Sequence, residues 1–168
     1  MNIKILLLVL IFTIFTAFSC ASREERIELI KQEVDLIIKK TDNAEMFNGL
    51  FVEGENRADF RAYFDDKDLI FINEDLAKGY WSGVTNLYYF KGNELIYFSQ
   101  KEVGFESADS KNKRTIEIEI YFDSGKVLDS TKKLKGQYVD IPQEEIQQIL
   151  NHAKKIQEVA NDLNPKLN

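Results

Sequence analysis

The sequence predicts an α+β domain: an antiparallel β-meander of about six strands, arranged as three hairpins, with an N-terminal and a C-terminal helix packed on one face. Two observations predict the helices: apolar residues recur every three or four positions after residue 22 and again before Pro165. A third predicts the sheet, because the middle of the chain alternates apolar and polar residues around short polar turns.

The first element is a secretory signal over residues 1–19. It has one cation, Lys4, followed by an apolar run from Ile5 to Phe18 and then a small residue, Ser19. A helix that spans a bilayer needs about 20 apolar residues, which is longer than this run. We therefore expect cleavage and a single mature domain over residues 20–168.

The end of this signal, Ala17-Phe18-Ser19-Cys20, resembles the lipobox of bacterial lipoproteins, with Ala17 at the position where Leu is usual. The resemblance implies cleavage before Cys20 and attachment of acyl chains such as palmitate to that residue. It also implies a lipid-anchored protein of the bacterial cell envelope, at the outer membrane or facing the periplasm rather than released. Two acyl chains give stable anchoring where one does not.

Ordinary signal peptidase is the alternative, because Ala17 and Ser19 also suit its cleavage site. The product would be a soluble protein with a free thiol. Cys20 is the only cysteine in the chain, so no internal disulfide can form, and an odd cysteine in an exported protein needs its own explanation. Lipidation supplies that explanation and is the interpretation we favour.

The N-terminal helix follows within two residues of Cys20. Ser22-Arg23-Glu24-Glu25 fits the capping-box pattern of a helix start. Apolar residues at helical spacing run from Ile27 to Ile38, and the helix is expected to end near residues 41–43. Without a flexible linker, the domain should lie close to the membrane.

Three hairpins are predicted at residues 63–72, 88–98 and 114–130. The first two place an aromatic pair before a polar turn and an apolar strand after it, and the third has strict alternation from Arg114 to Phe122. The pattern of residues 44–59 is less clear and leaves room for one short strand. The C-terminal helix should start at Asp140, as its cap, with Pro142 in the first turn, and should end at Pro165.

Composition excludes several classes of function. The formal net charge of −6 argues against nucleic-acid partners, which require a basic surface. One His and one Cys cannot assemble a usual zinc site, and the acidic cluster around Asp65, Asp66 and Asp68 lacks the EF-hand loop pattern. We therefore expect no metal and no cofactor, and His152 is expected to lie on a solvated helix flank.

Aromatic residues are the candidate binding anchors. If both helices cover one face of the sheet, some of the aromatic side chains between residues 80 and 98 must point to the open face. The residues singled out are Tyr80, Trp81, Tyr88, Phe90 and Tyr97. Exposed Trp and Tyr often anchor protein partners. Cross-strand stabilisation of the sheet is the alternative interpretation.

The sequence thus favours a non-enzymatic protein- or peptide-binding module close to the membrane, possible roles being that of an inhibitor or an immunity-type protein. The alternative is a small carbohydrate-active enzyme that uses Glu117 and Glu119, two carboxylates on the polar face of one strand. Glu alternating with Ile is also the ordinary pattern of a sheet with one solvated face.

Overall fold

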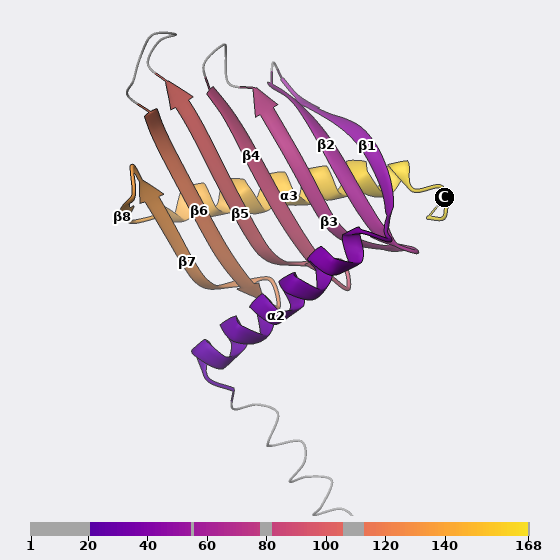
Figure 1. Cartoon of the computed structure of the whole chain (residues 1–168), viewed down its shortest axis with the longest axis horizontal. Helices are drawn as coiled ribbons and strands as arrows, with labels where there is room; N and C mark the ends of the chain where they lie inside the picture. Colours follow the sequence, from indigo (N-terminus) through magenta and orange to yellow (C-terminus); the bar gives the residue numbers. More distant parts are fainter. Residues whose placement is uncertain (1–20, 55, 78–81, 106–112, 168) are drawn as a thin grey trace, which may run out of the picture.

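The computed structural model describes residues 21–54, 56–77, 82–105 and 113–167. Within these ranges, two helices flank eight strands in the chain order α2, β1 to β8, α3 (Figure 1). Their bounds are α2 (Arg23–Thr41), β1 (Glu45–Glu53), β2 (Asn56–Asp65), β3 (Asp68–Ala77), β4 (Ser82–Lys91), β5 (Glu94–Phe105), β6 (Lys113–Asp123), β7 (Lys126–Leu134), β8 (Gln137–Val139) and α3 (Gln143–Leu163).

The strands form one antiparallel sheet in sequential order, β1 to β8, which confirms the α+β meander. The three expected hairpins are β2–β3, β4–β5 and β6–β7. The expected count of about six strands is wrong, because β1 pairs along its whole length with β2 and the short β8 closes the other edge. Residues 44–59 thus contribute a nine-residue strand and the start of a second.

The two helices lie on opposite faces of the sheet, which corrects the expectation that they share one (Figure 1). Helix α2 packs Val34 and Ile37 against Ile70 and Tyr89. Helix α3 packs on the other face, where most of the buried apolar side chains lie. The reason is that several strands carry adjacent apolar residues, such as Tyr89-Phe90, so that the sheet presents apolar surface on both sides.

Each of the three hairpins repeats one local feature, a Tyr-Phe pair just before the turn. Strand alternation places the Tyr on the α2 face and the Phe in the α3-side core, and the pairing register shifts between the two residues of each pair. The pairs are Tyr63-Phe64, Tyr89-Phe90 and Tyr121-Phe122. Such bulges increase the local twist of the strands.

The helix starts differ. Ser22 caps α2, its hydroxyl accepting from the amide of Glu25 at 3.2 Å while the Glu25 carboxylate accepts from the amide of Ser22 at 2.7 Å, so the capping box is confirmed. Helix α3 begins after Pro142 with no side-chain cap, so Asp140 is not the cap that we expected. Among the described residues, neither helix is long and apolar enough to cross a membrane.

Candidate functional site

An open groove lies along one flank of α3, between that helix and β3 to β6. Helix α3 approaches β1 and β3 most closely, which leaves space beside the later strands. The groove has a volume of about 430 Å³. Its apolar wall consists of Leu76, Val84, Phe98, Ile116 and Ile149, and its polar lining of Asn86, Tyr88, Gln100, Glu102, Glu145, Gln148 and His152.

A buried carboxylate lies behind the floor of this groove. Glu74, on β3, has a relative exposure of 0%. Its Oε2 accepts from Asn86 Nδ2 at 2.9 Å and from the Tyr88 hydroxyl at 2.8 Å. His152 Nε2 lies 2.8 Å from Oε1 and 3.0 Å from Oε2. Because an ionised carboxylate only accepts, Nε2 must carry the proton of this contact.

This environment favours the ionised form of Glu74. Burial by itself would raise the pKa of Glu74, but the hydrogen bonds and charge of His152, with the bonds from Asn86 and Tyr88, lower the pKa below its ordinary value. The pKa of Tyr88 is raised by burial and by the neighbouring Glu74 charge, so its hydroxyl stays a donor. We call these four residues, Glu74, Asn86, Tyr88 and His152, the Glu74 cluster.

Asn86 completes the floor with an unused acceptor. Its residue exposure is 7%, and its Oδ1 has no hydrogen-bond partner. Because the Glu74 carboxylate requires a donor, the amide nitrogen faces Glu74 and the oxygen faces away from it. Buried polar atoms are nearly always bonded, so this acceptor stands out among the groove residues.

The rim of the groove is acidic, with each carboxylate held by a cation from a neighbouring element. Both oxygens of Glu145 accept from Lys132 Nζ, at 2.8 and 2.7 Å, which joins α3 to β7. Arg114 lies 3.8 Å from Glu102 across β5 and β6. Lys132 lies on β7, and its side chain is only 18% exposed.

The aromatic residues that we expected to act as binding anchors lie in different parts of the molecule. Tyr88 and Phe90 are each 1% exposed in the α3-side core, so neither presents a surface to a partner. This placement corresponds to the alternative interpretation, in which the aromatics stabilise the sheet. Tyr88 nevertheless belongs to the groove through its hydroxyl. Cys20, Tyr80 and Trp81 lie outside the described residues.

Tyr97 belongs to an aromatic row that crosses five strands on the α2 face. Neighbouring ring centroids in the row are 4.8 to 5.5 Å apart. The row consists of Tyr63, Phe71, Tyr89, Tyr97 and Tyr121. Helix α2 packs against part of it, through Val34 and Ile37. Cross-strand aromatic pairs of this kind stabilise a sheet.

The paired carboxylates of the enzyme alternative also lie on the α2 face. Glu117 and Glu119 line a small hollow of about 220 Å³. Glu119 accepts a hydrogen bond from the Tyr97 hydroxyl at 2.9 Å. In the strand register, Glu117 lies opposite Lys101 of β5 and Lys133 of β7. Within the described ranges, no group of three or more acidic, His or Cys side chains could hold a metal ion.

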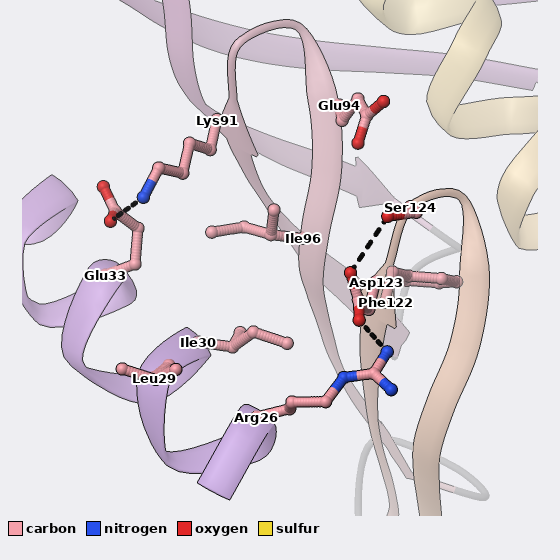
Figure 2. Close-up of a pocket in the computed structure, with 10 residues that line it drawn as sticks. All are labelled: Arg26, Leu29, Ile30, Glu33, Lys91, Glu94, Ile96, Phe122, Asp123 and Ser124. Atoms are coloured by element: carbon pink, nitrogen blue, oxygen red, sulfur yellow. Dashed lines mark hydrogen bonds and ion pairs between the residues drawn. The ribbon is translucent and has the colours of Figure 1, made fainter. Parts of the chain in front are cut away.

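A second hollow, of about 280 Å³, lies where α2 crosses two hairpin turns (Figure 2). Ile30 and Ile96 form its apolar floor, and ion pairs stand at its two sides. Lys91 donates to Glu33 at 2.5 Å, and Arg26 pairs with Asp123. These charges already pair with each other between helix and sheet, so we attribute this hollow to the docking of α2.

Sequence reasoning missed the Glu74 cluster and placed His152 on a solvated flank. The chain did contain a signal: Glu74 stands two residues from Ile72 and two from Leu76, and therefore on the same apolar face of its strand. His152 follows Ile149 by three residues, at the border of the apolar stripe of α3. Only the pairing of strand and helix brings these two residues, 78 positions apart, into contact.

Comparison with known proteins adds no relative: no protein-family model, no curated protein and no solved structure matches this chain.

Proposed function

We propose that this chain is a non-enzymatic binding protein of the bacterial cell envelope, tethered to the bilayer through acylated Cys20. The groove beside α3 takes a segment of a protein or peptide partner. An inhibitor or immunity-type role, in which the partner is an enzyme that acts on the envelope, fits a tethered binder of this size. The tether and the envelope location rest on the lipobox resemblance of residues 17–20.

The observation that carries this proposal is the Glu74 cluster at the groove floor, in which both oxygens of the buried carboxylate are hydrogen-bonded. Burying a carboxylate is costly, and an apolar residue at this position would fill the core with less penalty. The cluster instead fixes the positions of Asn86, Tyr88 and His152 beside the groove. The groove thus combines an apolar wall with polar groups held in fixed positions, and binding sites use such fixed polar groups for specificity.

The same bonds favour binding over turnover. The Tyr88 hydroxyl and the His152 Nε2 proton are both directed at Glu74, so neither is aimed at a molecule in the groove. The remaining polar lining consists of amides and of the carboxylates Glu102 and Glu145. These groups recognise donors on a partner and supply no activated nucleophile.

The charge of the chain suggests the kind of partner. The formal net charge is −6, whereas the two rim carboxylates, Glu102 and Glu145, are each paired with a cation, so the expectation rests on the charge of the whole chain. Complementary charge speeds encounter and suppresses incorrect partners. We therefore expect a basic partner, such as a lysozyme-like hydrolase, and an association rate that falls as ionic strength rises.

Site-specific photo-cross-linking in the native envelope tests the proposal. A photoreactive residue at Gln148, which lines the groove, should capture a partner that mass spectrometry can identify. The matched control is Gln147, the exposed neighbour that bonds to Asn151 instead. Capture from Gln148 that is lost in Gln100→Trp, a variant that fills the groove, supports the proposal. Equal capture from both positions, or none, contradicts it.

The enzyme alternative, a carbohydrate-active protein, would use the other face of the sheet. Its support is that Glu117 and Glu119 share one hollow with the polar side chains of Ser99 and Thr131. Glu117→Gln should abolish turnover of a glycan substrate under this alternative. Under the binding proposal, the same substitution should leave capture from Gln148 unchanged.

A further inference from the structure

The two edges of the sheet differ in how they are protected. Strand β8 is only three residues long, and the lysines of β7 lie beside it, with Lys133 Nζ 5.0 Å from the Tyr138 ring centroid. Short strands and lysines protect an edge from pairing with another chain. Strand β1 forms the opposite edge, and among the described residues only β2 pairs with it.

Strand β1 has neither kind of protection. It is nine residues long and has no charged residue between Glu45 and Glu53. Three apolar side chains on it are largely exposed: Met46 at 46%, Leu50 at 43% and Val52 at 56%. A long, apolar and unpaired edge is a template for another strand.

The sequence of β1 shows which strand fits. EMFNGLFVE is nearly the same in both directions around Gly49, with glutamates at both ends and Phe47 matching Phe51. We propose that two copies of this chain pair antiparallel through β1, with Gly49 on the twofold axis. In this register, Met46 of one copy lies opposite Val52 of the second copy, and Phe47 lies opposite the Phe51 of that copy.

The ends of the strand are compatible with this register. Glu45 of one copy would lie opposite Glu53 of the other, and two bare carboxylates there would repel. Each copy supplies its own cation, because Lys166 donates to Glu45 at 2.6 Å and Lys155 pairs with Glu53. Lys166 also donates to Asp66 at 3.2 Å, so these cations reduce the repulsion between the paired glutamates without cancelling every charge, and the apolar centre provides the contact.

The symmetry also agrees with a membrane tether. A twofold axis through an antiparallel strand pair stands perpendicular to the sheet, so the α2 helices of both copies lie on one side and both grooves on the other. Both N-terminal ends of α2 can then face one bilayer while both grooves remain open. The pairing itself does not depend on what the groove binds.

Disulfide cross-linking of the full chain in detergent tests the register. A mixture of Met46→Cys and Val52→Cys chains should form a mixed disulfide dimer on oxidation. Each variant alone should not exceed the unmodified chain, because two Met46 positions lie about 20 Å apart in this register. Equal cross-linking in the single variants, or none in the mixture, overturns the proposed pairing.

A charge placed on each edge tests which one is used. Val52→Lys should convert the dimer to a monomer in sedimentation equilibrium of the full chain. Val139→Lys, on β8, is the matched control, with a native side chain of similar exposure at 41%, and should leave the dimer unchanged. A monomeric unmodified chain, or a dimer that survives Val52→Lys, contradicts the proposal.

Discussion

The two faces of this sheet are built from the same strands but differ in chemistry. The α3 face holds most of the buried apolar residues together with the Glu74 cluster and the groove. The α2 face holds a smaller buried group, the aromatic row and rows of exposed polar residues. The difference indicates that α2 mainly closes and positions the sheet, whereas α3 both completes the core and forms a site.

Polar contacts should contribute more to the free energy of unfolding on the α3 face than on the α2 face. We expect this difference to be the largest of the effects predicted here. His152→Leu leaves the buried Glu74 without its principal partner and should lower the free energy of unfolding by about 3 kcal/mol or more. Tyr97→Phe, on the α2 face, removes one part-exposed bond to Glu119 and should cost about 1 kcal/mol. Urea unfolding at neutral pH measures both, and similar losses would contradict the contrast.

Apolar contacts give a second comparison. Ile156 on α3 is 0% exposed and Ile37 on α2 is 2% exposed. Replacing a buried Ile by Ala costs about 2 to 5 kcal/mol, depending on how closely it is surrounded. We expect Ile156→Ala to fall in the upper part of that range and Ile37→Ala in the lower part. Thermal and urea unfolding of both variants measure these losses. A larger loss for Ile37→Ala than for Ile156→Ala would indicate that α2, and not α3, is the main core helix.

The two helix starts give a smaller effect. Ser22→Ala removes the capping box of α2 and should lower the free energy of unfolding by about 1 kcal/mol. Pro142→Asp offers α3 the cap that it lacks and should raise the free energy of unfolding by up to about 1 kcal/mol. A Ser22→Ala variant with the stability of the unmodified chain would show that the capping box contributes nothing to the folded state.

The pH dependence of Glu74 is expected to be the smallest effect. Its folded pKa is lowered, so its contribution to stability is present above the unfolded pKa of about 4.3 and is lost as pH falls through the folded value. The difference in unfolding free energy between the wild type and Glu74→Gln should therefore shrink from pH 5 to pH 3. A difference that grows over this interval would mean that Glu74 is protonated in the folded protein.

Local patterns predicted the elements that depend on neighbouring residues. The capping box at Ser22 and the three hairpins follow from short-range spacing, and the structure contains all of them. The placement of the helices could not be predicted from the strict alternation of β6 alone, because β3 and β4 carry apolar residues on both sides.

The candidate site could not be predicted from the sequence for a related reason. Glu74 and His152 are far apart in the chain, and their contact depends on where α3 crosses the sheet. Tyr88 and Phe90 are residue types that often serve as exposed anchors, yet the strand alternation that turns Tyr89 to the α2 face turns both of them into the α3-side core. Only the tertiary arrangement decides which aromatic side chains reach solvent.

Cross-linking from the two faces in the same envelope preparation tests the central claim most directly. A photoreactive residue at Gln148 reports on the groove, and one at Lys101 reports on the exposed polar rows of the α2 face. If the groove is the binding site, the residue at Gln148 should capture a partner and the residue at Lys101 should capture none. Capture from Lys101 alone would place the partner on the α2 face and contradict this assignment.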